Sequence, residues 1–338
     1  MKKQLLRAGL GVAALTLVAP LLAACSGDDE PKLVIYNAQH EPLLKELAPA
    51  FTEETGIEVE LRNGKDLELS NTLVQEGDAS PADVFLTENS PAMSQVEAAG
   101  LFAKLPDDLV APIPEQYRPR SGLWTGFVAR STVLVYNTEQ VQESDLPASL
   151  LDLAKPEWKG RISFSPTGAD FQAIVAAVLE LEGEEATRAW LEGIKENGTV
   201  YDGNNVVLEA VDSGQVEVGI VYHYYWERDR KENGDVSDSS AQHYFTDQDP
   251  GAFVSVSGAG ILESSDMKDE AEKFIEFLVN ETGQQVLADS YALEYPLNPA
   301  VELPGVTKAF SELEPPEVNV SDLDARKVVD LMTEVGFL

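Results

Sequence analysis

The 338-residue chain contains a single cysteine, Cys25, and only three histidines. One thiol cannot form an internal disulfide, and so few sulfur and imidazole groups argue against a zinc site. No segment matches the G-x-S-x-G elbow, the H-E-x-x-H helix or the G-x-x-x-x-G-K-[ST] phosphate loop. Because no nucleophile stands beside a base in any such motif, we expect that the protein is not an enzyme.

Positive charge is also scarce. The chain has 24 Lys plus Arg against 59 Asp plus Glu, which gives a formal net charge of −35. A charge of this size repels nucleic acid and anionic lipid surfaces and keeps a protein soluble and monomeric. We therefore expect a monomer that binds no nucleic acid and meets a membrane only through a covalent anchor.

Long apolar runs are absent except near the start, where a basic segment precedes the apolar stretch Ala8 to Leu21. That stretch is too short for a stable membrane span and is typical of a signal peptide. It ends in Leu22-Ala23-Ala24-Cys25, which resembles a bacterial lipobox and implies a lipid on Cys25. We expect a lipoprotein signal peptide at 1–24, the lipidated cysteine and a polar tether at 25–31, and an extracytoplasmic protein anchored to the cell membrane. The alternative is an ordinary secretory signal with a stray cysteine.

The remaining residues, about 300, suffice for two domains and alternate short apolar segments with amphipathic ones. The expected strands are 32–36, 57–61, 82–86, 161–164 and 216–221, and the expected helices are 42–55, 171–181, 224–232 and 269–287. Strands that alternate with helices predict an α/β fold with open, mostly parallel sheets flanked by helices.

Ligands of such sheets bind outside the carboxyl ends of the strands. The segments at those ends are 37–40, 87–89, 165–170 and 222–226, and their polar side chains include His40, Glu88, Asp170, His223, Tyr224 and Tyr225. Oxygen donors suit hard cations, and phenolate suits ferric iron. A phenol with a pKa near 10 loses its proton at neutral pH when a trivalent cation binds it.

The tyrosine pair carries a geometric requirement. On a regular strand Tyr224 and Tyr225 would point to opposite faces of the sheet. They can converge on one ion only where the strand has ended and the backbone turns into a helix. The apolar strand stops at Val221 and polar helix-forming residues begin at Glu227, so the sequence predicts such a turn.

Three segments resemble the signature segments of bacterial periplasmic ferric-iron-binding proteins, namely Tyr36-Asn37-Ala38-Gln39-His40, Ala82 to Glu88 and Tyr224-Tyr225-Trp226. The resemblance implies a two-lobed, type II periplasmic-binding-protein-like fold with the ligand cleft between the lobes. It implies that the protein is the substrate-binding component of an iron ABC importer and delivers Fe(3+) to a permease. The iron ligands would be His40, Glu88, Tyr224 and Tyr225.

The same resemblance implies where the lobes divide. Lobe 1 would comprise 32–130 plus 253–303, and lobe 2 would comprise 131–252 plus 304–338. His40 and Glu88 would then belong to lobe 1 and the two tyrosines to lobe 2, so that one ion bridges both lobes.

The family also binds a synergistic anion such as phosphate, and the matching residues here are Thr167, Gly168, Ala169 and Asn204. Asp170 departs from the family pattern because it adds a negative charge where an anion should bind. Aspartate is a favoured N-cap, so Asp170 is expected to cap the following helix. Otherwise the site uses a different anion such as carbonate, or Asp170 itself replaces the anion. Tyr222 and His223 replace asparagines of the family and are further candidates for the site.

The main alternative is a binding protein of the same fold for another small ligand, such as a phosphonate, sulfate or a polyamine. An anion receptor would need Arg and Ser donors, whereas a polyamine site would need several carboxylates and stacking rings. The two hypotheses therefore differ at the site and not in the fold.

Overall fold

The computed structural model describes residues 31–234 and 239–338. Cys25, the predicted signal peptide and all of the predicted tether except Pro31 lie outside the described residues. In the described part, no helix is both long enough and apolar enough to cross a membrane.

One half of the structure is built on three parallel strands, β1 (Leu33–Asn37), β2 (Val59–Asn63) and β3 (Val84–Leu86), with β1 in the middle. The helices α1 (Glu41–Thr55), α2 (Asp66–Glu76) and α3 (Pro91–Ala98) connect and follow these strands. β1 and β3 are almost entirely buried, as expected for apolar strands covered on both faces.

The other half is built on β5 (Ile162–Phe164), which pairs in parallel with β6 (Gly198–Val200) and β7 (Val218–Tyr222). Its helices are α4 (Ala169–Asn197), α5 (Asn204–Asp212) and α6 (His223–Asn233). The predicted helix 171–181 is the first part of α4, which is interrupted at Gly183, where φ is 79°.

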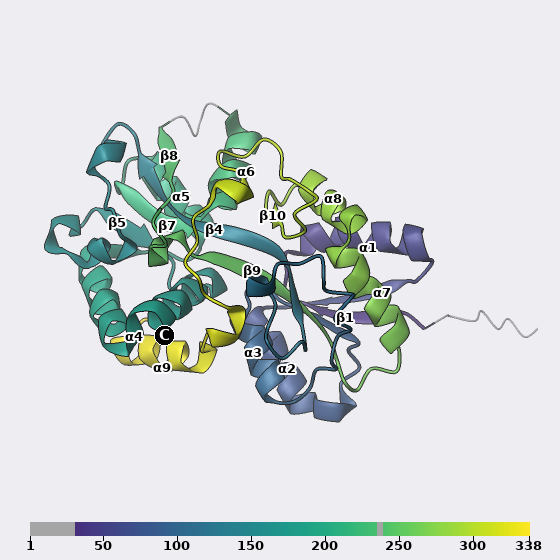
Figure 1. Cartoon of the computed structure of the whole chain (residues 1–338). Coiled ribbons are helices and arrows are strands. Elements are labelled where there is room, and N and C mark those ends of the chain that lie inside the picture. Colours follow the sequence, from purple (N-terminus) through teal and green to yellow (C-terminus); the bar gives the residue numbers. More distant parts are fainter. Residues whose placement is uncertain (1–30, 235–238) are drawn as a thin grey trace, which may run out of the picture. The chain divides into compact units, whose positions relative to one another are not determined.

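Two long strands, β4 (Thr125–Asn137) and β9 (Val254–Ile261), connect the halves (Figure 1). The first part of β4 pairs antiparallel with β9, and its second part pairs antiparallel with β7 and β8 (Ser240–His243). The short strand β10 (Tyr295–Pro296) also pairs with β4. Parallel pairing therefore holds for the outer strands, but not for the strands that run between the halves. The sheet as a whole is mixed, in the order β2-β1-β3-β9-β4-β7-β5-β6.

The prediction of one helix over 269–287 is wrong. The structure has α7 (Lys268–Val279) and α8 (Glu281–Asp289), separated by Asn280, whose side chain caps α8 by accepting a 2.9 Å bond from the Gly283 amide. A Cβ on Gly283 would lie 1.8 Å from the carbonyl oxygen of Phe277, so α8 packs closely against the end of α7. The apolar pattern continues across the break because each helix buries apolar residues and both contact α1.

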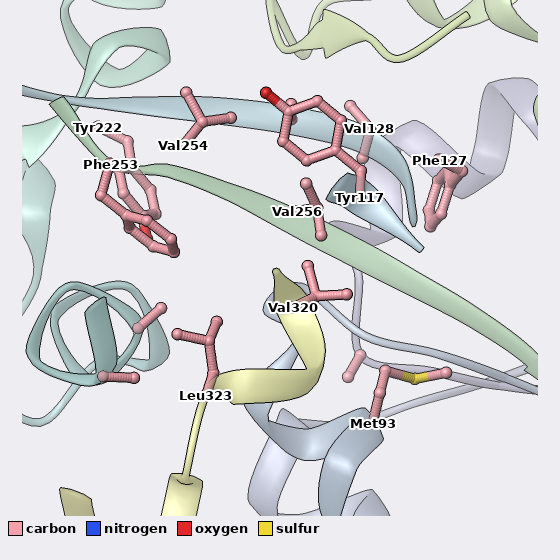
Figure 2. Packing of buried hydrophobic residues seen from close by; sticks show 14 of the residues in the cluster. Met93, Tyr117, Phe127, Val128, Tyr222, Phe253, Val254, Val256, Val320 and Leu323 are labelled. Carbon is pink, nitrogen blue, oxygen red and sulfur yellow. The ribbon is translucent and has the colours of Figure 1, made fainter. Parts of the chain in front are cut away.

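The C-terminal segment ends in α9 (Ala325–Val335), which packs on α4 and also contacts α3. Buried residues from both halves form one large cluster together with this segment. Figure 2 shows part of it, with Val128 of β4, Val254 and Val256 of β9, and Val320 and Leu323 of the C-terminal segment. Short 3-10 helices occur at Gly77–Ala79, Glu115–Tyr117, Glu143–Asp145, Leu150–Ala154, Pro156–Trp158, Pro250–Ala252, Phe310–Glu312 and Val320–Asp322.

Candidate metal centre

The polar residues that follow four different strands come together in the structure. His40 follows β1, Glu88 follows β3, Asp170 lies in the first turn of α4 after β5, and Tyr224 and Tyr225 lie in the first turn of α6 after β7. The contacts described below join all five side chains. The structure therefore brings together the side chains that follow these strands, and their role as one site stays a prediction.

His40 lies between two carboxylates. Its Nε2 is 3.2 Å from Oε1 of Glu88, and its Nδ1 is 2.8 Å from Oε1 of Glu294. The side chains of His40 and Glu88 are 21% and 22% exposed, whereas that of Glu294 is fully buried. Solvent therefore reaches His40 and Glu88, as it also reaches the partly exposed Tyr225, but not Glu294.

The two tyrosines converge as the sequence required. β7 ends at Tyr222 and α6 begins at His223, so Tyr224 and Tyr225 lie in helical backbone and not on a strand. Their ring centroids are 4.3 Å apart with an interplanar angle of 31°. The hydroxyl of Tyr224 is 3.4 Å from Oε1 of Glu88 and 3.5 Å from Oδ2 of Asp170, and that of Tyr225 is 3.0 Å from the same Oδ2. Both phenols thus point at one carboxylate oxygen.

Asp170 does not cap α4, so the favoured prediction for this residue is wrong. The N-cap is Gly168, and no side chain bonds the free amides there. Asp170 is buried and turned inward, where its Oδ1 accepts a 3.1 Å bond from Nδ2 of Asn89 and its Oδ2 a 2.8 Å bond from Nδ2 of Asn204. Two amides and two phenols solvate this carboxylate more fully than the helix terminus alone would.

The other predicted anion residues face a cavity. Thr167, Gly168 and Ala169 line a space of about 360 Å³ together with Glu88 and Asn89. Asn204, by contrast, bonds the carboxylate of Asp170. An anion role for these four residues stays a prediction.

Tyr222 and His223 are fully buried. The hydroxyl of Tyr222 donates to the backbone oxygen of Asp170 at 3.2 Å and is 3.4 Å from Oδ1 of Asn89. His223 stacks on Tyr295 with centroids 4.2 Å apart, and burial lowers its pKa to about 3. Tyr222 therefore supports Asp170, and His223 is a neutral residue packed behind the site.

The phenols keep their protons in the absence of a cation. Burial raises the pKa of Tyr224 and Tyr225 well above 10, and the negative charge of Asp170 adds to this. Burial also raises the pKa of Asp170, to about 7. Burial alone would lower the pKa of His40, but its bonds to Glu294 and Glu88 outweigh that and raise it to about 9. Of the groups that face one another here, the two phenols and Asp170 resist ionisation, and a highly charged cation would stabilise their ionised forms by replacing the protons.

Sequence reasoning missed three residues of the cluster, Asp66, Arg130 and Glu294. The carboxylate of Asp66 accepts the backbone amides of Glu88 and Asn89, each at 2.9 Å, and so holds the loop that carries Glu88. Arg130 is fully buried in β4 and forms a 2.8 Å ion pair with Glu294. The only sequence signal for Arg130 is that it is a charged residue within a mostly apolar strand. Glu294 directly precedes the short strand β10, and no local motif marks it.

Among residues 31–234 and 239–338, no group of three or more histidine, cysteine or acidic side chains is arranged to hold a metal ion. The cluster also contains the phenol oxygens of Tyr224 and Tyr225, which lie beside the carboxylates of Glu88 and Asp170.

Comparison with known proteins gives consistent matches. Residues 79–318 match a family described as bacterial extracellular solute-binding protein. The chain is 50% identical over 331 residues to the Fe(3+)-binding periplasmic protein of Serratia marcescens. The aligned region covers 97% of this chain and 98% of the Serratia protein. Iron-bound HitA from Pseudomonas aeruginosa superposes with a TM-score of 0.85 at 40% identity, covering 90% of this chain and 99% of that one. The Trichodesmium protein IdiA (FutA) in complex with iron and citrate has a TM-score of 0.80 at 28% identity, covering 91% and 100%.

Proposed function

Because this chain belongs to the bacterial extracellular solute-binding protein family, we propose that it captures ferric iron outside the cytoplasm as the binding component of an ABC importer. Its fold is the type II periplasmic-binding-protein fold of its structural neighbours, which confirms the predicted fold class. The family is one of solute-binding proteins and not of enzymes, in agreement with the absence of a catalytic motif. The relatives named for ferric iron, at up to 50% identity, support the same substrate for this chain.

The observation that carries the proposal is a chain of close donor atoms. Nε2 of His40, Oε1 of Glu88, the Tyr224 hydroxyl, Oδ2 of Asp170 and the Tyr225 hydroxyl follow one another at 3.2, 3.4, 3.5 and 3.0 Å. Around a small octahedral cation with bonds of about 2.0–2.1 Å, neighbouring ligand atoms lie roughly 3 Å apart. A slight contraction of these contacts would therefore suit one cation, and the donor set suits a hard one.

Asp170 takes the place of an external anion in this proposal. Its carboxylate already lies between the two phenols and is held by Asn204, the residue that the family resemblance assigns to anion binding. With His40, Glu88, Tyr224 and Tyr225 it supplies five donors and leaves one position for water or a small anion. Thr167, Gly168 and Ala169 would then line the approach to the iron and would not hold a required phosphate or carbonate.

The ligands come from both halves of the molecule. His40 and Glu88 belong to the proposed lobe 1 (32–130 plus 253–303), and Asp170 and the tyrosines belong to the proposed lobe 2 (131–252 plus 304–338). An ion bound from both sides stabilises the closed arrangement selectively. Reopening of the lobes on the permease, with return of protons to the phenols, would release the iron.

The remaining parts of the proposal concern the surroundings of the protein. We infer a lipid on Cys25 that anchors the chain to the cell membrane, a single-chain state, and an iron permease as the partner. The relatives named as periplasmic proteins support an extracytoplasmic location. Labelling of cells with a radioactive fatty acid tests the anchor, because Cys25→Ser should abolish the label.

Titration of the iron-free protein with ferric citrate tests the proposed function. Phenolate bound to ferric iron gives a visible charge-transfer band, so the wild-type protein should turn red to purple at one equivalent. Tyr136→Phe serves as a control because Tyr136 pairs with Val218 at the other end of β7, away from Tyr222, and should leave the band unchanged. A colourless mixture in which the protein gains no thermal stability would favour a receptor for a phosphonate, sulfate or polyamine.

A further inference from the structure

Glu294 is a fully buried carboxylate that the proposed set of iron ligands does not use. It lies in the short connection between α8 and β10. The preceding residue, Leu293, has a φ of 53°, in the left-handed region that non-glycine residues seldom adopt. Such strain persists only where surrounding contacts hold it, and it is concentrated at functional sites.

The two oxygens of Glu294 have different partners. Oε1 is 2.8 Å from Nδ1 of His40, and Oε2 is 2.8 Å from Nη2 of Arg130. Arg130 also donates to the backbone oxygen of Glu88. The buried guanidinium of Arg130 therefore holds Glu294, which in turn contacts His40. It also holds the main chain at Glu88, so the positions of both His40 and Glu88 depend on Arg130.

The arrangement determines which nitrogen of His40 is free. In a neutral imidazole one nitrogen carries the proton and the other offers a lone pair. A carboxylate that accepts from Nδ1–H keeps the proton there and leaves Nε2, the nitrogen beside Glu88, as the metal-binding atom. Histidines that bind metals usually have such a partner, and its removal typically costs 10–100-fold in metal affinity.

We propose that Glu294 is a positioning residue for iron capture, holding the His40 proton on Nδ1 so that Nε2 faces the cation. The proposal rests on the proposed function. The competing explanation is that Glu294 only neutralises Arg130, since an unpaired buried charge would be costly. The two explanations differ in whether the effect of Glu294 on iron binding passes through His40.

The substitution Glu294→Gln separates them. The two oxygens of Glu294 face different donors, and glutamine replaces one of these oxygens with an NH2 donor while it retains the size of the side chain. Either His40 or Arg130 therefore loses the acceptor that it faces. Glu217→Gln is the matched control, because Glu217 forms a 2.6 Å ion pair with Arg161 in the other half of the structure, away from the cluster.

The expected results come from iron affinities measured in competition with citrate. Glu294→Gln should weaken binding by about 10-fold or more, and Glu217→Gln should leave it unchanged. In a His40→Ala background, Glu294→Gln should have less than about a twofold effect, since the residue it positions is gone. An equal loss in both backgrounds, or no loss in the wild-type background, would overturn the proposal.

A second measurement needs no iron. Nitrogen-15 NMR of the iron-free protein at pH 10, above the His40 pKa of about 9, should show the His40 proton on Nδ1 in the wild type and a shift toward Nε2 in Glu294→Gln. A wild-type proton on Nε2 contradicts the proposed positioning whatever the iron affinity is. A wild type that shows the expected proton position but binds no ferric iron would instead overturn the proposed function.

Discussion

The hydroxyl of Tyr225 donates a 3.0 Å hydrogen bond to Oδ2 of Asp170, the carboxylate oxygen that Asn204 also bonds. The hydroxyl of Tyr224 lies 3.5 Å from the same oxygen, and in the proposed site this carboxylate takes the place of an external anion. The first prediction follows from this internal carboxylate.

Asp170→Asn should make iron binding depend on an added anion. The wild-type protein is expected to bind ferric iron in buffer free of phosphate and carbonate. The variant loses one negative ligand and should bind at least about 10-fold more weakly there, a loss of about 1.4 kcal/mol. Added phosphate or carbonate should restore part of the affinity.

Asp202→Asn is the control for that experiment, because Asp202 lines the neighbouring cavity but is exposed and is not one of the proposed iron ligands. Its affinity should equal that of the wild type. A wild-type protein that needs added anion as strongly as Asp170→Asn would show that Asp170 does not act as the internal anion.

The stability of the iron-free protein should depend on pH through Asp170. Burial raises the pKa of this carboxyl from 3.8 to about 7. Between these values the folded chain keeps a proton that the unfolded chain loses, so the contribution of Asp170 to stability is present below pH 3.8 and disappears as the pH rises through 7. The Tm of Asp170→Asn minus that of the wild type should therefore increase from pH 4.5 to pH 8.

Scanning calorimetry of both iron-free proteins at the two pH values measures this difference. Asp66 and His40, whose pKa values are raised to about 8 and about 9, change stability in the same direction. Both are present in the two proteins, so their effects largely cancel. A Tm difference that is independent of pH would mean that Asp170 is ionised in the folded protein throughout this range.

Tyr225→Phe and Tyr224→Phe should each weaken the visible band of the iron-loaded protein, because each removes one phenolate. They should also reduce the stabilisation that iron provides, which for a ligand at 100 times its Kd is about 2.7 kcal/mol. Thermal unfolding with and without one equivalent of iron measures the second effect. If both variants retain the wild-type band and the wild-type shift in Tm, the phenols do not bind the iron.

Gly283→Ala should destabilise the protein without touching the iron site. Its Cβ would meet the Phe277 carbonyl oxygen at 1.8 Å, so the contact between α7 and α8 must open. Overpacking of this kind costs about 1–3 kcal/mol. Urea unfolding should show this loss, whereas Gln285→Ala, at an exposed position of the same helix, should stay within about 0.5 kcal/mol of the wild type.

Much of the site could be predicted from the sequence because its signals are local. His40, Glu88 and the tyrosines each follow an apolar segment short enough to be a strand, and the ends of parallel strands meet at one edge of a sheet. The turn from β7 into α6 was also readable, since the apolar run stops and helix-forming residues follow. These features depend only on neighbours in the chain.

The tertiary structure alone decided the rest. Asp170 could have capped its helix, and it turns inward because Asn89, Asn204 and the tyrosines, all distant in sequence, donate to it. Glu294 reaches His40 across 254 positions, and no local pattern records that contact. The break at Asn280, by contrast, did have a local signal that the prediction missed, since asparagine is a favoured N-cap and its side chain accepts from the Gly283 amide. The sequence determined which donors lie at the strand ends, and the fold determined how they are charged, oriented and supported, since those properties arise from contacts between distant segments.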